Sequence, residues 1–213
     1  AIDIVNDGEM SKPSYPTYIK DRLHGFGGES GKYSFRDLDE FPGTGAKVFA
    51  DTGRARRKAP ACNAPISVRD MEAPRRDAER LVALAGGRPT FMSALSPGTT
   101  SLFFGNEHYP SHEAYLFAIA EALRHEYETI VDAGIDLQID CPDLAMGRHV
   151  QYADLDLPSF RKRIALHVEA LNHAVANIPA ESLRMHLCWG NYPGPHHCDV
   201  PLAEIIDIVW LAK

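Results

Sequence analysis

Two side chains near the end of the sequence, His186 and Cys188, have the types and the spacing of metal ligands. One residue separates them in the apolar segment 183–188, which we expect to form a β-strand. Because side chains alternate between the two faces of a strand, both would point to the same side. An imidazole and a thiolate are half of a tetrahedral zinc site. The pair therefore predicts two zinc ligands, with a buried histidine beside a packed cysteine as the alternative.

Polar residues also stand at the ends of other predicted strands. Glu9 follows the apolar segment 2–5, Ser96 follows the segment 89–95, and Asp140 ends the segment 135–140. The carboxyl ends of parallel barrel strands meet at one rim, so we expect these side chains to gather with His186 and Cys188. Two carboxylates in one pocket are costly unless they meet a cation. This favours a ligand that carries an ammonium group.

Strands and helices are predicted to alternate along the chain. Short apolar runs predict strands at 2–5, 61–68, 89–95, 135–140 and 183–188. Apolar residues at helical spacing predict helices at 13–23, 70–85, 111–134, 160–175 and 202–210. Residues 24–60 have weak periodicity and predict an irregular excursion with a short strand at 47–50.

This alternation favours an α/β fold with a parallel sheet. No Gly-x-Gly-x-x-Gly or Walker loop follows a strand, which counts against a nucleotide-binding sheet. A (β/α)8 TIM barrel typically has ~250 residues. We therefore predict a single, incomplete TIM-barrel catalytic domain over residues 1–213, with roughly five consecutive β-α units. The first residues already read as a strand and the last ones as a helix without a stop signal, so we expect a piece of a longer protein.

Composition and charge exclude several classes of protein. The net charge of −7 counts against a nucleic-acid-binding surface. The basic run 54–58 is either a solvated loop or a patch for an acidic substrate. No segment approaches the ~18 apolar residues of a membrane span, and the four cysteines come without a signal peptide. We expect a cytoplasmic, reduced protein, and its oligomeric state is not predicted.

Several segments together resemble the cobalamin-independent methionine synthases. They appear in the family's order along nearly the whole chain: Asn6-Asp7-Gly8-Glu9, Ser96-Pro97-Gly98-Thr99, Gln138 to Met146, and His186-Leu187-Cys188-Trp189-Gly190. The resemblance implies a (β/α)8 barrel in which zinc activates the thiol of homocysteine to take a methyl group from a methylated folate. It assigns His186 and Cys188 as two zinc ligands, Glu9 and Asp140 to the amino group of homocysteine, and Ser96 to the substrate site.

The same resemblance leaves parts of the site open. In the family, a Glu and a second Cys on later strands complete the zinc shell, so this chain alone is expected to be inactive. Where the synthases have Asp-Glu-Pro-Ala, this sequence has Asp140-Cys141-Pro142-Asp143, and Cys141 is either packed or lines the site. No general acid for the folate nitrogen is identified, and His149 is only a local candidate.

Three alternatives stay open. A related alkyltransferase would use another thiol, such as coenzyme M, with Arg148 as the nearby cation. Alternatively, the protein is a relative of these enzymes that binds metal without catalysing a reaction. The third concerns His196-His197-Cys198, which either joins His186 and Cys188 in a metal cluster or forms a loop near the mouth of the pocket. The histidines on or beside predicted helices are expected at the surface or in packing: His108, His112, His125, His167 and His173.

Overall fold

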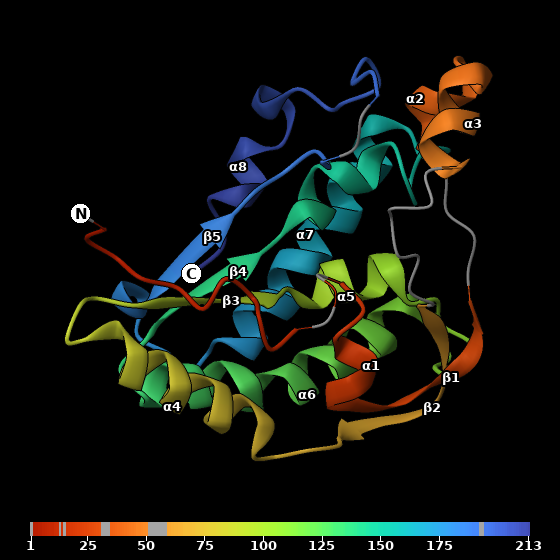
Figure 1. The fold of residues 1–213 in the computed structure, drawn as a ribbon. Coiled ribbons are helices and arrows are strands. Elements are labelled where there is room, and N and C mark those ends of the chain that lie inside the picture. Colours follow the sequence, from red (N-terminus) through yellow and green to blue (C-terminus); the bar gives the residue numbers. More distant parts are fainter. Residues whose placement is uncertain (1, 13, 15, 31–34, 51–58, 192–193) are drawn as a thin grey trace.

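A computed structural model of the chain describes residues 2–12, 14, 16–30, 35–50, 59–191 and 194–213. Its centre is a three-stranded parallel sheet with the order β3 (Phe91–Leu95), β4 (Asp136–Asp140) and β5 (Leu183–His186). Val5 forms a parallel bridge with Thr90, so the N-terminal segment runs beside β3 (Figure 1). The α/β class is confirmed. The described strands do not close a barrel, and the complete (β/α)8 barrel and its extent over residues 1–213 stay predictions.

The helices that follow the strands form the other layer. Helix α6 (His112–Asp132) packs against β3 and β4, and it is flanked by α4 (Ala73–Ala85) and α7 (Leu157–Ala174), as Figure 1 shows. Ser111 begins α6, because its side chain accepts a hydrogen bond of 3.0 Å from the backbone N–H of Ala114. Asp156 caps α7 in the same way through Ser159 at 2.8 Å. These predicted helices are confirmed.

Shorter helices connect these elements. Helix α5 (Pro97–Phe103) follows β3 directly, and α8 (Ile206–Val209) packs on α7 near the end of the chain. Short 3-10 helices lie at Pro142–Leu144, Met146–Arg148, Ala180–Ser182 and Leu202–Glu204. Within the described ranges, no helix combines the length and apolar character that crossing a membrane requires.

The two faces of the parallel sheet differ in chemistry. Leu137 and Ile139 on β4 are buried in the hydrophobic core. Gln138 and Asp140 alternate with them and therefore point to the opposite face. The register places Asp140 beside Leu95 on β3 and beside His186 on β5. The polar side chains of the three strands thus share one face and one end of the sheet.

The segment before residue 70 departs from the predicted alternation. Strand β1 (Leu23–Ser30) pairs antiparallel with β2 (Pro60–Val68), so the predicted strand 61–68 is confirmed but does not belong to the parallel sheet. Gly25 makes the pairing possible, because a Cβ there would lie 2.9 Å from the carbonyl oxygen of Ala64. Glycine-rich strands carry little hydrophobic alternation, which is why β1 escaped prediction.

Three other predicted elements are corrected. Helix α1 (Ile19–Arg22) is one turn rather than a helix over 13–23, and the predicted strand 2–5 has a single bridge at Val5. The predicted strand 47–50 is wrong, since these residues end helix α3 (Pro42–Ala50), which follows α2 (Arg36–Asp39). A short apolar run is compatible with either a helix or a strand, so its hydrophobic period alone cannot distinguish the two. The basic run 54–58 lies outside the described residues.

Candidate functional site

The carboxyl ends of β4 and β5 bring Asp140 and His186 together. The two residues are register partners, and His186 Nδ1 lies 3.0 Å from Asp140 Oδ1. The carboxylate is buried, whereas the histidine side chain is 47% exposed. Because this contact uses Nδ1, the second ring nitrogen, Nε2, points away from Asp140. A carboxylate in this position fixes the orientation of an imidazole whose other nitrogen binds a metal.

Gln138 holds the same carboxylate from its own strand. Its side-chain amide donates hydrogen bonds to Asp140 Oδ1 at 3.0 Å and to Ser93 Oγ at 3.2 Å. Strand residues two positions apart share a face, which brings these side chains within reach of one another. Asp140 is therefore held in place from β3, β4 and β5 together.

Glu9 reaches the same place from the N-terminal segment. It lies in a turn in which the backbone N–H of Gly8 donates to Asn6 Oδ1 at 2.8 Å and that of Glu9 donates to Asp7 Oδ1 at 3.0 Å. Glu9 has a φ of 56°, and it is the one described residue other than glycine with a positive φ. A side chain in this left-handed region is strained, and such strain is concentrated at functional sites.

A small hollow contains Glu9, Asp140 and a buried cation, Lys12. Burial raises the pKa of Glu9, Lys12 lowers it, and the Asp140 carboxylate raises it further, with a net rise. Glu9 and Asp140 thus lie close enough to interact, as the sequence predicts. The sequence did not identify Lys12, which appears there as one lysine in a polar turn.

The ammonium group of Lys12 is engaged on the far side of the hollow. It donates to the carbonyl oxygen of Ser93, lies 3.6 Å from Glu126 Oε1, and stands 4.5 Å from the ring centre of Tyr18. Glu126 is on α6 and is also buried. Lys12 therefore ties the N-terminal segment to β3 and α6, and its charge also acts on the carboxylate of Glu9.

Ser96 lies behind Asp140 in a buried hydrogen-bond network. Its hydroxyl accepts from the N–H of Thr99 at 2.9 Å, which begins α5, and donates to Asp143 Oδ1 at 2.7 Å. The N–H of Ser96 and the hydroxyl of Thr99 both donate to the carbonyl oxygen of Asp140 at 3.0 Å. The backbone of Asp140 is thus fixed by the turn that follows β3.

Two histidines extend this network into the helices. His167 Nδ1 lies 2.8 Å from Asp143 Oδ2, and its Nε2 lies 3.2 Å from Nε2 of His112. His167 and Asp143 are both buried. Burial, with the charges of His167 and Arg163, lowers the pKa of His112 to about 3. Of the two expectations for this histidine, surface or packing, the structure excludes the surface: His167 is a buried hydrogen-bond partner of Asp143.

Cys188 lies just beyond the sheet. Strand β5 ends at His186 rather than at residue 188, so strand alternation does not place the cysteine. Its sulfur accepts a hydrogen bond of 3.2 Å from the N–H of Gly190. Among the described residues, no group of three potential ligand atoms within 4.8 Å of one another includes His186 or Cys188. The zinc pair stays a prediction.

The remaining candidates lie elsewhere. Cys141 is buried, and burial together with Asp143 raises the pKa of its thiol, which fits the packed alternative. The guanidinium of Arg148 donates to the carbonyl oxygens of Tyr152 and Ala153 at 3.2 and 3.1 Å. His149 is buried with its Nδ1 3.1 Å from Asp199 Oδ1, and burial lowers its pKa.

Of the two alternatives for His196-His197-Cys198, the metal cluster with His186 and Cys188 is not found among the described residues. His197 and Cys198 contact Asp37 on α2, and His196 contacts Asp199, instead of approaching His186 and Cys188. Residues 197 and 198 lie in a turn, and no pattern in the sequence around them predicts which residues this turn contacts.

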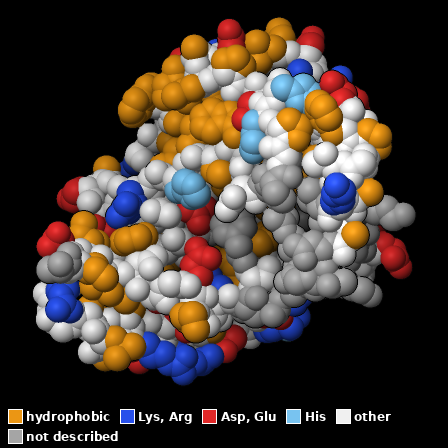
Figure 2. All heavy atoms as spheres, turned by 45° about the horizontal axis from the view of Figure 1, so that its top comes forward, with side chains coloured by type: hydrophobic (Ala, Val, Ile, Leu, Met, Phe, Trp, Pro, Cys, Tyr) orange, Lys and Arg blue, Asp and Glu red, His pale blue; other side chains and the backbone are white. Residues whose placement is uncertain are grey.

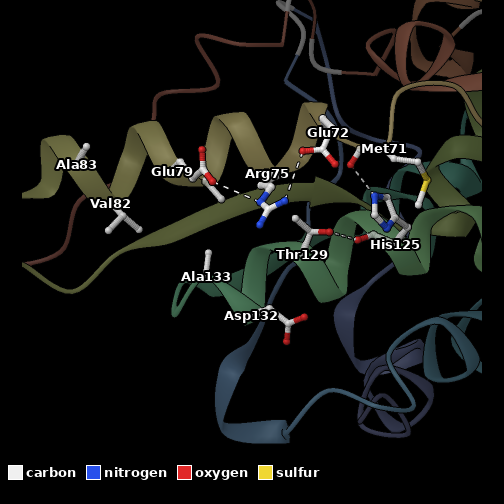
Figure 3. Close-up of a pocket in the computed structure, with 11 residues that line it drawn as sticks. Met71, Glu72, Arg75, Glu79, Val82, Ala83, His125, Thr129, Asp132 and Ala133 are labelled. Carbon is white, nitrogen blue, oxygen red and sulfur yellow. Dashed lines mark hydrogen bonds and ion pairs between the residues drawn. The ribbon is translucent and has the colours of Figure 1, made fainter.

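A hollow of about 610 Å³ lies between helices α4 and α6 (Figure 3). Arg75 crosses it between Glu72 and Glu79, at 3.6 and 3.4 Å, and His125 contacts the carbonyl oxygen of Met71 at 2.8 Å. These charged side chains are paired with one another, and none of the lining residues belongs to a strand. This groove has no part in the site at the strand ends.

Comparison with known proteins identifies relatives of one kind. The chain is 33% identical over 97 residues to a methionine synthase of Saccharolobus islandicus (strain L.S.2.15 / Lassen #1), covering 45% of this chain and 25% of that protein. It is 30% identical over 112 residues to a methionine synthase of Saccharolobus solfataricus, covering 51% and 30%. The chain spans about a quarter to a third of the length of these relatives. No family model matches.

Solved structures give the same result for the fold. A B12-independent methionine synthase from Shewanella sp. W3-18-1, in complex with selenomethionine, superposes with a TM-score of 0.60 at 20% identity, over 89% of this chain and 47% of that one. A putative vitamin-B12 independent methionine synthase from Listeria monocytogenes gives 0.57 at 16% identity, over 90% and 51%. The relatives and the fold are those that the sequence motifs predicted, so the resemblance is confirmed over part of those proteins.

Proposed function

We propose that the polar end of the β3–β4–β5 sheet is part of the active site of a cobalamin-independent methionine synthase. The enzyme moves a methyl group from a methylated folate to the thiol of homocysteine and forms methionine. The observation that carries this proposal is the approach of Glu9, Asp140 and His186, from three distant parts of the sequence, at one end of the sheet. The relatives named above support the class of reaction.

His186 and Cys188 suit a zinc ion in their chemistry. His186 is held through Nδ1 by Asp140, which leaves Nε2 as the ligand atom, and Cys188 receives an N–H hydrogen bond of the kind that stabilises a thiolate. The other ligands would come from outside the described residues. A zinc ion bound here supplies a deprotonated, nucleophilic acceptor thiol at neutral pH.

Glu9 and Asp140 would bind the ammonium group of homocysteine. The ammonium of Lys12 is directed to Ser93 and Glu126, and the pKa of Glu9 is raised despite its presence. An added cation is therefore favourable between the two carboxylates. Arg148, the cation that a sulfonate thiol would need, is engaged by backbone carbonyls, which favours an amino-acid thiol.

Ser96 would contribute indirectly. Its hydroxyl is buried and bonded to Asp143 and Thr99, and its N–H holds the carbonyl of Asp140. We therefore assign it to the support of the substrate site, where it positions Asp140.

Methyl transfer tests the proposal in the protein expressed from the complete reading frame that contains this sequence. Methionine is expected from methyltetrahydrofolate and homocysteine, with no product from coenzyme M. Asp140→Asn is expected to raise KM for homocysteine and to lower kcat/KM by about ten-fold or more, since a charge-assisted hydrogen bond contributes ~1.5–3 kcal/mol.

Asp136→Asn is the matched control. Asp136 begins the same strand at its opposite end and is exposed, so kcat/KM should be unchanged. Methylation of coenzyme M but not of homocysteine would overturn the assigned acceptor. An equal loss in both variants would overturn the role of the carboxyl end of the sheet.

A further inference from the structure

A second group of potential metal ligands lies away from the sheet end, where helix α2 meets the loop after β5. Ligand atoms of Asp37, His197 and Cys198 all lie within 4.8 Å of one another. His197 Nδ1 is 3.2 Å from Asp37 Oδ1, and the N–H of Cys198 donates to the same oxygen at 2.7 Å. Asp37 and Cys198 are 161 positions apart in the sequence, so the tertiary structure alone creates the group.

The types of these ligands and their spacing suit zinc. Bonds of ~2.0–2.3 Å at tetrahedral angles separate two ligand atoms by roughly 3.3–3.7 Å, close to the distance between His197 and Asp37. Nitrogen, sulfur and oxygen together select zinc over magnesium or calcium, which prefer oxygen alone. Asp37 is fully buried, and a buried carboxylate is stabilised by a cation beside it.

Glu40 provides a separate indication. It lies one turn beyond Asp37, and its Oε1 is 3.2 Å from Nε2 of His197. A hydrogen bond from Nε2–H to Glu40 leaves the lone pair of Nδ1 directed at Asp37, on the side where the ion would bind. Metal-binding histidines regularly donate their other N–H to a carboxylate in this way.

We propose that Asp37, His197 and Cys198 form a zinc site that joins helix α2 to the loop after β5, with water as the fourth ligand. The ion replaces the thiol proton of Cys198, so binding releases one proton and leaves the imidazole neutral. Figure 2, in which the top of Figure 1 comes forward, shows histidine and acidic side chains side by side on this face. The site is distinct from the proposed pair at His186 and Cys188 and does not depend on it.

A zinc ion at this site would cross-link two segments that are distant in the sequence. Helix α2 belongs to the excursion between β1 and β2 (Figure 1), and Arg36 bonds it to the segment after β4 through the carbonyl oxygens of His149 and Ala153, at 2.9 and 2.6 Å. A zinc ion would link this excursion to the loop that follows His186. Zinc is therefore expected to stabilise the folded chain, because an ion that binds only the folded state shifts the unfolding equilibrium.

Titration of the metal-free 213-residue chain with zinc, and with cobalt as a spectroscopic substitute, tests the proposal. One equivalent is expected to bind with a thiolate-to-cobalt charge-transfer band and a higher Tm. Cys198→Ser and His197→Ala should each remove the band and weaken zinc binding at least 100-fold. Glu40→Gln should weaken it 10–100-fold, as for other partners of metal-bound histidines.

Two variants serve as controls. Cys188→Ser removes the other partly exposed cysteine. His196→Ala removes a histidine next to His197 that is not part of the ligand group of Asp37, His197 and Cys198. Both should keep the charge-transfer band and the rise in Tm. Circular dichroism of the metal-free variants shows that each has folded.

Three results would overturn the proposal. The first is a band that survives in Cys198→Ser and disappears in Cys188→Ser. The second is zinc that is retained in Cys198→Ser and lost in Asp199→Asn, which would place the ion with Asp37, His149 and Asp199 instead. The third is a folded chain that binds no zinc at micromolar concentrations.

Discussion

Removal of the buried carboxylate of Asp143 is expected to destabilise the protein more than removal of any exposed helix cap. Asp143 is 1% exposed and accepts hydrogen bonds from Ser96 at 2.7 Å, Thr99 at 2.6 Å and His167 at 2.8 Å. The two hydroxyls keep other partners in Asp143→Ala, because they bond to each other and Thr99 also donates to Asp140. The imidazole of His167 loses its carboxylate partner.

The magnitude follows from these contacts. A buried donor without its partner costs ~1–3 kcal/mol, and breaking a buried charged pair costs ~3–5 kcal/mol. Since only one of the three donors loses its main partner, we expect about 3 kcal/mol for Asp143→Ala. Asp143→Asn keeps the shape and one acceptor, so it should cost about half as much.

Urea unfolding at pH 7, followed by circular dichroism, measures the effect. Asp156→Ala is the matched control, since it removes an exposed carboxylate that caps α7 through Ser159. Loss of such a cap costs ~1 kcal/mol. The reasoning is refuted if Asp143→Ala lowers the free energy of unfolding no more than Asp156→Ala does.

Three further changes test other contacts. Gly98→Ala should destabilise the fold by several kcal/mol, seen as a large drop in Tm, because its Cβ would overlap the buried side chains of Asp143 and His167. Lys12→Met should cost ~3 kcal/mol, because it leaves the buried carboxylate of Glu126 without its cation and with a hydrogen bond of 3.4 Å from the hydroxyl of Tyr18. Adding Glu126→Leu should recover most of that loss in urea unfolding. The depressed pKa of His112 means that the unfolded chain binds this proton more readily, so stability falls as pH drops below 6.5. Linkage gives up to about 2 kcal/mol between pH 7 and 5, which solvent screening of the partly exposed ring reduces to about 1; unfolding of His112→Gln should lack this part of the pH dependence.

The fold was predictable where hydrophobic periodicity was strong. The long helices α4, α6 and α7 and the strands β3, β4 and β5 follow directly from apolar spacing. The antiparallel pair β1–β2 was not, because Gly25, Gly27 and Gly28 interrupt the alternation that marks a strand. Short segments such as 47–50 carry too few residues to separate a helical period from a strand period.

The sequence by itself determined which residue types stand at the ends of the parallel strands. Asp140 and His186 end up 3.0 Å apart because each ends a strand of the parallel sheet, and parallel pairing aligns those ends. Only the tertiary structure decided which charged side chains from distant segments of the sequence contact one another. Lys12 contacts Ser93 and Glu126, and Asp37 contacts Cys198. These contacts depend on how loops pack in the folded chain, and no local sequence pattern predicts them. Local periodicity reports burial along one element, whereas such contacts depend on how separate elements come together in space.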